Sequence, residues 1–160
     1  MADNEAPRWL NEDEQTLWRS LRSFVWAFPS AMDRQLSHDS DLSTGEYSVL
    51  ATLSESENDQ LRPSDTASDL GWERSRLSHL LRRMEAKGLI ERVPSLCDRR
   101  GHDVHLTAKG RATIEAAAPH HVRFVQETVF DALTQEEQDT LKTVLAKIHA
   151  KLDHHRQQEL

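Results

Sequence analysis

The segment that most constrains the fold of this 160-residue chain lies in its middle, where two helix patterns are joined by a glycine. Pro63 suits the first turn of a short helix, and Gly71 suits its end. From Arg74 to Lys87 apolar residues recur every three or four positions, which predicts a second helix with one buried face. Gly88 is placed to close this helix. Short helix, tight turn and basic amphipathic helix are the order of a helix-turn-helix.

Two β-compatible runs follow the basic helix and predict a hairpin. Their apolar residues are Leu89, Ile90, Val93, Val104 and Leu106. The stretch between them, residues 95–103, is charged and rich in turn-forming residues, and its tip holds Asp98, Arg99, Arg100 and Gly101. A hairpin directly after a helix-turn-helix is a wing. Residues 40–110 are therefore predicted to form a winged helix-turn-helix within a mainly α (α+β) fold.

Two helices are predicted before this segment. The first runs from residue 11 to about residue 36, and Pro29 is expected to bend it. The second runs from residue 43 to about residue 54, where a polar run begins that extends to residue 60. Their capping boxes are Asn11 with Glu14 and Ser43 with Glu46.

Two more helices are predicted after the hairpin. Thr107 caps the first, which spans residues 108 to about 133 and is expected to kink or break at Pro119. The second begins at a capping box, Thr134 with Glu137, and carries apolar residues at helical spacing. Its polar end is expected to fray.

Charge is distributed unevenly along the chain. The formal net charge of −7 argues at first against a polyanionic partner, because binding to phosphates requires a basic surface. Residues 74–111, however, contain ten Lys and Arg against four acidic residues, so this window carries +6 and the remainder −13. A basic segment on an acidic chain indicates a nucleic-acid partner.

The basic helix and the wing suit double-stranded DNA. The major groove, about 12 Å wide, admits one α-helix, whose N-terminal half reaches the base edges. The candidates in that half are Arg74, Ser75, Arg76, Ser78 and His79. Arg82 and Arg83 are expected to meet the phosphate backbone. Arg99 and Arg100 are expected to enter a narrow minor groove from the wing, with Asp98 orienting Arg100.

The wing also carries a family signature. Asp98, Arg100, Leu106 and Thr107 match the D-x-R-x5-L-T pattern of the multiple antibiotic resistance regulator (MarR) family, with Lys109 and Gly110 following. Residues 74–92 resemble that family's recognition helix leading into the first wing strand. The resemblance spans about residues 62–110. It implies a bacterial transcriptional regulator in which Arg100 is the minor-groove residue and Asp98 its partner.

The family resemblance further implies the organisation of the whole chain. Residues 1–160 would form a single domain, and residues 11–38 and 111–157 would hold a homodimer together. The protein would be a repressor of a pseudo-palindromic operator. A small molecule, often an anionic aromatic, would bind between the DNA-binding and dimerisation regions and change the spacing of the two recognition helices. No cofactor or metal is expected.

Composition and motifs narrow the remaining function classes. No apolar run approaches the ~18 residues of a membrane span, and the acidic N-terminus does not resemble a signal peptide. The lone Cys97 agrees with a reducing compartment, so a cytoplasmic protein is expected. No nucleophile elbow, phosphate-binding glycine loop or HExxH motif is present, which argues against an enzyme.

Several alternatives remain open at the level of sequence. A winged-helix module that binds a basic protein instead of DNA is one, and a metal-responsive regulator is another. The histidines available to a metal are His120, His121, His149, His154 and His155. Cys97 is expected to be inert, although neighbouring arginines favour a reactive thiolate. Trp18, Phe24, Trp26 and Phe28 are expected to pack in the core or against a partner chain, rather than line a ligand pocket.

Overall fold

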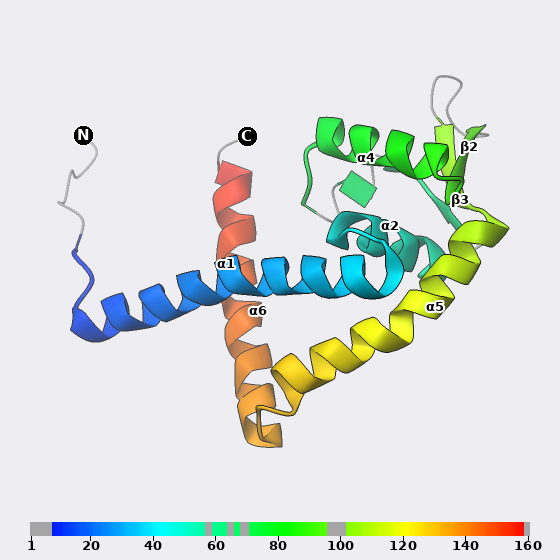
Figure 1. Cartoon of the computed structure of the whole chain (residues 1–160). Helices are drawn as coiled ribbons and strands as arrows, with labels where there is room; N and C mark the ends of the chain where they lie inside the picture. Colours follow the sequence, from blue (N-terminus) through cyan, green and yellow to red (C-terminus); the bar gives the residue numbers. More distant parts are fainter. Residues whose placement is uncertain (1–7, 57–58, 64–65, 68–70, 96–101, 159–160) are drawn as a thin grey trace. The chain divides into compact units, whose positions relative to one another are not determined.

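The computed structural model describes residues 8–56, 59–63, 66–67, 71–95 and 102–158, except the side chains of residues 156–158. Figure 1 gives the order of the elements along the chain. The chain divides into two compact units, Met1–Ala117 and Ala118–Leu160. Within the described residues no helix is both long enough and apolar enough to cross a membrane.

The two predicted N-terminal helices are present and begin at their predicted caps. Helix α1 spans Glu12–Ser40, four residues beyond the expected end, and continues through Pro29. Helix α2 spans Thr44–Glu55. The capping boxes Asn11 with Glu14 and Ser43 with Glu46 are both formed. Local hydrogen bonding at these caps therefore decides where each helix starts.

The helix-turn-helix is formed by a short helical segment and α4. Pro63, Thr66 and Ala67 are helical, whereas the predicted inward-facing Leu70 lies outside the described residues. Gly71 has a φ of 62°, the left-handed backbone that ends helices at glycine. Helix α4 follows at Arg74–Ala86, and Gly88, with a φ of 72°, turns the chain toward the wing.

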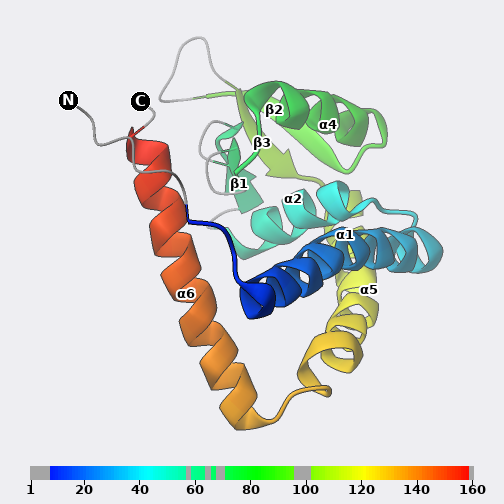
Figure 2. The same ribbon diagram turned by 90° about the vertical axis from the view of Figure 1, so that its left-hand side faces the viewer.

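Three strands form one antiparallel sheet in the order β1-β3-β2. The predicted hairpin is confirmed: β2 spans Ile90–Pro94, β3 spans His102–Leu106, and Ile90 pairs with Leu106. Strand β1, Gln60–Leu61, pairs with the other edge of β3 and was not predicted. Figure 2 shows the three strands together, with α4 next to the hairpin.

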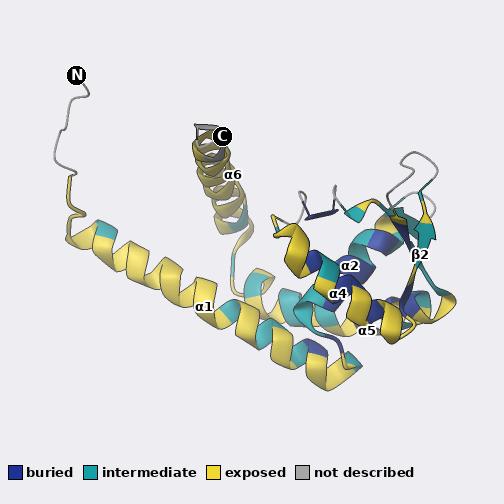
Figure 3. Cartoon of the chain, turned by 90° about the horizontal axis from the view of Figure 1, so that it is seen from above, coloured by how far each residue is buried: buried dark blue, intermediate teal, exposed yellow. Residues whose placement is uncertain are grey.

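The core of the first unit lies among α2, α4, the sheet and the first part of α5. Its fully or almost fully buried residues include Val49, Leu50, Leu53, Leu77, Met84, Ile90, Val104 and Ile114. Figure 3 shows the buried positions concentrated on α2 and α4, while most of α1 is exposed. Leu36, near the C-terminal end of α1, is buried completely. Much of α1 therefore extends beyond the core of its own chain.

The C-terminal helices differ from the prediction at one point. Helix α5 spans Ala108–Val125 and is capped by the Thr107 hydroxyl, which accepts from the Gly110 amide at 3.0 Å. Of the kink or break expected at Pro119, the break does not occur, since α5 continues through this residue. The helical geometry instead changes at η2, a π-helical turn over Gln126–Phe130. Helix α6 follows at Gln135–Gln158, after the predicted Thr134 and Glu137 capping box.

Candidate DNA-binding surface

Helix α4 presents a polar face opposite its apolar one. Leu77, Leu80, Leu81 and Met84 are buried in the core. Successive residues of an α-helix are rotated by about 100°, so the middle of the opposite face is formed by Ser75, His79 and Arg82. All three are exposed. Arg74 and Ser78 lie on one flank of this face, and Arg76 and Arg83 on the other.

The arginines of α4 are exposed and are not paired with acids. Arg74, Arg76, Arg82 and Arg83 are all exposed, and none of them takes part in a salt bridge with another described residue. The nearest basic residues behave differently, since Lys87 pairs with Glu46 at 2.9 Å and Arg92 lies 3.4 Å from Glu85. The positive charge of α4 therefore remains available to an external anion.

The N-terminus of α4 adds to this positive potential. Glu73 is the N-cap residue, but its side chain accepts no capping hydrogen bond, and the first turn contains no acidic residue. The amides at the start of a helix carry a partial positive charge, which an anion such as a phosphate neutralises. Arg74 and Arg76 lie in the same turn. The backbone amides, Arg74 and Arg76 therefore all contribute positive charge at the N-terminal end of α4, against the single carboxylate of Glu73.

Two polar contacts fix α4 against its neighbours. Glu46, only 4% exposed, accepts from the Ser43 amide and pairs with Lys87 at the C-terminal end of α4. Burial by itself raises the pKa of Glu46, but the Ser43 hydrogen bonds and the Lys87 ammonium outweigh it, so the pKa is lowered. Lys109 donates to the Lys87 carbonyl oxygen at 2.6 Å. These contacts connect α2, α4 and α5.

A groove lies on the α2 side of α4. It has a volume of about 740 Å³ and is bordered by α1, the start of α2 and α4. The Arg76 guanidinium lies 4.8 Å from the centre of the Trp72 ring, at cation–π distance. The carboxylate in the groove, Asp33, accepts from both the amide and the hydroxyl of Thr44, which lowers its pKa.

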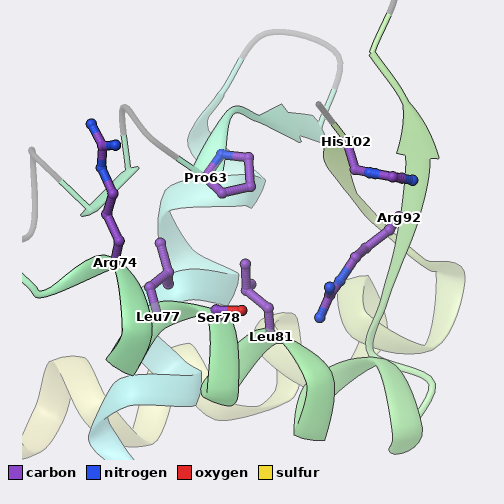
Figure 4. A pocket seen from close by; sticks show the side chains of 7 residues that line it. All are labelled: Pro63, Arg74, Leu77, Ser78, Leu81, Arg92 and His102. Carbon is purple, nitrogen blue, oxygen red and sulfur yellow. The ribbon is translucent and has the colours of Figure 1, made fainter. Parts of the chain in front are cut away.

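A smaller cavity of about 230 Å³ lies on the other side of α4, between this helix and the wing strands (Figure 4). Its lining residues are Pro63, Arg74, Leu77, Ser78, Leu81, Arg92 and His102. The Nε and Nη2 atoms of Arg92 are buried and have no hydrogen-bond partner among the described residues. Cationic groups above an apolar floor suit a small anion with an apolar body.

The predicted contact residues fall into two groups in the structure. Seven of them lie on α4, where Ser78 is half-buried against the cavity and the others are exposed. The wing residues Asp98, Arg99 and Arg100, together with Cys97, lie outside the described residues. Trp72 and Arg92 were missed by the sequence analysis. A tryptophan two residues before a helix and an arginine in a β-pattern carry no distinctive sequence signal.

The aromatic residues of α1 and the possible metal ligands are the remaining candidates from the sequence. Trp18, Phe24 and Trp26 are between 52% and 66% exposed, so they do not belong to the core of their own chain. Phe28 stacks on Phe24 at 5.1 Å between ring centres. Among the described residues, no three His, Cys, Asp or Glu side chains gather in a way that could hold a metal ion.

The fold and the basic surface define a winged helix-turn-helix protein of the transcriptional-regulator class. Residues 32–117 match a family model described as "Transcriptional regulator SarA/Rot". The structure is similar to Sco3205 from Streptomyces coelicolor, a MarR family transcriptional regulator crystallised with DNA. The two chains are 36% identical, the match covers 93% of each, and the TM-score is 0.89. AbsC, from the same organism, is 35% identical, with 92% of this chain and 99% of AbsC covered and a TM-score of 0.88.

The chain belongs to the MarR family of transcriptional regulators, which are not enzymes. Among curated proteins, the transcriptional repressor MprA of Escherichia coli K12 is 30% identical over 107 residues, or 67% of this chain. The matched region makes up 60% of that relative's length.

Proposed function

We propose that this chain is a sequence-specific DNA-binding repressor that acts as a homodimer on a pseudo-palindromic operator in the bacterial cytoplasm. The observation that carries the proposal is the exposed face of α4, which presents four arginines without a described acidic partner. Support also comes from relatives, since Sco3205 was crystallised with DNA and MprA is named a repressor.

The geometry of α4 divides its side chains between bases and backbone. A helix about 10–12 Å across nearly fills a major groove about 12 Å wide, so its central face meets base edges and its flanks meet phosphates. Ser75, His79 and Arg82 are central and are proposed to read bases. The wing residues Asp98, Arg99 and Arg100 are proposed to act in the flanking minor groove, where negative potential is enhanced.

The homodimer is proposed on the basis of exposed apolar side chains on α1 and on α6. Those on α1 are Leu17, Trp18, Leu21, Phe24, Val25 and Trp26. Those on α6 are Leu141, Val144, Leu145, Ile148 and Leu152. Each is 40–70% exposed in the single chain, and apolar stripes of this size are usually covered. A second copy would bring two α4 helices to successive major grooves, about 34–36 Å apart.

A small anionic effector is proposed to regulate DNA binding from the cavity beside α4. This cavity lies within the winged helix-turn-helix. The family resemblance instead implies a site between the DNA-binding region and the dimerisation helices. The buried Nη2 atom of Arg92 offers a donor to a carboxylate, beside the Nε atom that lies 3.4 Å from Glu85, and Leu77 and Leu81 offer an apolar surface. Such a ligand changes DNA affinity only if it binds the DNA-competent and incompetent conformations unequally.

Selection of bound duplexes from a random DNA pool tests the proposed function. We expect a palindrome with half-sites one helical turn apart, and an affinity for it that falls steeply with salt. Arg82→Ala and Arg100→Ala should each weaken binding by at least fivefold, whereas Lys142→Ala on α6 removes the same charge and should leave it unchanged. A pool without enrichment, or binding insensitive to salt, would point to a module that binds protein.

A further inference from the structure

We propose that Trp72 is a positioning residue for DNA binding, which holds Arg76 on the flank of α4 so that Arg76 contacts phosphate and not bases. This inference rests on the proposed function and assigns roles within the same surface. Its geometric basis is the stacked pair, in which the Arg76 guanidinium lies 4.8 Å from the centre of the indole ring.

Trp72 is itself held firmly. Its backbone amide donates to the Ala67 carbonyl oxygen at 2.8 Å, and its ring packs against the hydrophobic core. The outer edge of the ring lies 3.4 Å from the point where a Cβ on Gly45 would stand. Because α2 passes so close at a glycine, the indole lies between α2 and α4 and presents a face to Arg76.

Other partners for Arg76 are restricted on this side of α4. Asp33, the carboxylate that lines the same groove, accepts from Thr44 through Oδ1, at 2.8 and 2.5 Å, and is not in a salt bridge with Arg76. Arg76 forms no salt bridge within the described part of the chain. The aromatic face of Trp72 is therefore the feature that orders this long side chain before DNA arrives.

The position on the flank decides what Arg76 can reach. A residue on the flank of a helix inserted in the major groove faces a groove wall, which consists of phosphates. An ordered arginine also loses less rotamer entropy on binding than a mobile one. Trp72 thus raises affinity for DNA of any sequence, while discrimination between sequences is left to the central face.

The test measures binding to the selected duplex and to a scrambled duplex. Arg76→Ala should weaken both by the same factor and lower the salt slope by about one unit. Trp72→Leu should weaken both duplexes by about two- to fivefold, the range of an exposed cation–π contact. In the Arg76→Ala background, Trp72→Leu should have no further effect. In the chain that keeps Arg76, Trp72→Phe should bind DNA more tightly than Trp72→Leu, because it retains an aromatic ring.

Three results would overturn the inference. They are effects of the two substitutions that multiply in the double variant, tighter binding by Trp72→Leu, and reduced discrimination between the duplexes by Arg76→Ala. Thermal unfolding of Trp72→Leu separates a general loss of stability from loss of the pair, and the ring-current shift of the Arg76 side-chain protons reports stacking without DNA. Failure of the wild-type protein to bind any duplex instead rejects the proposed function, and stacking would still be measurable.

Discussion

At the scale of single residues, Gly110 is required by a close approach between α5 and the start of β2. A Cβ at this position would stand 2.0 Å from the Leu89 carbonyl oxygen and 2.8 Å from a methyl group of Leu106. The first contact is with backbone, which cannot rotate away. The glycine in the KG pair after the wing is therefore a packing requirement, and not only part of a family pattern.

Gly110→Ala is therefore expected to destabilise the protein, by about 1–3 kcal/mol or more. The direction is informative, because the same substitution inside an unobstructed helix stabilises by up to about 1 kcal/mol. Urea unfolding followed by circular dichroism measures the change. Ala112→Gly, at an exposed position of the same helix, is the matched control and should cost about 1 kcal/mol by propensity alone. An unchanged or higher stability of Gly110→Ala contradicts the packing argument.

At the scale of elements, the buried Glu46 joins the beginning of α2 to the end of α4 through Lys87. Its pKa lies below the ordinary value of about 4.5, so the folded state holds this carboxylate ionised. A lowered pKa contributes stability that is fully present above the ordinary value and is lost as pH falls through the folded value.

Glu46→Gln should consequently lower the free energy of unfolding near neutral pH by about 1–3 kcal/mol, because it removes the ion pair and leaves Lys87 without its partner. The difference from wild type should shrink as pH falls below about 4.5. Unfolding measured at pH 7 and pH 4 checks this. Glu137→Gln, in an exposed capping box, should have a smaller effect. A difference of equal size at both pH values would show that the charge of Glu46 does not stabilise the fold.

The elements predicted from sequence are those specified by local signals. The caps at Asn11, Ser43, Thr107 and Thr134 are local hydrogen bonds, and the apolar face of α4 is a local periodicity, so both are readable from the chain. Strand β1 is only two residues long and exists through its pairing with β3, more than 40 residues away. The stacking of Arg76 on Trp72 likewise depends on how the turn between two helices places an indole.

At the scale of the whole molecule, exposed apolar residues predict the oligomeric state. A double substitution of Leu145→Glu and Ile148→Glu, on one stripe of α6, should convert a dimer into single chains, because it would bury charge without a partner. Sedimentation velocity measures the change. Affinity for the full operator should fall about a hundredfold or more, because a single chain binds one half-site and no longer brings a second subunit to the other half-site. Lys147→Glu, between the two positions, should remain dimeric, and an unaltered sedimentation coefficient in the double variant would reject α6 as the contact.

The arginines of α4, which have no acidic partner among the described residues, also affect how fast the protein associates with DNA. Residues 74–111 carry a net charge of +6 and the remaining residues −13, so the net positive charge is confined to one segment of the chain. A nearby duplex attracts that segment and repels the remainder, which turns the protein toward a productive orientation during diffusion. Salt screens this orienting interaction. The association rate constant is therefore expected to fall as ionic strength rises, even where dissociation from the operator is slow.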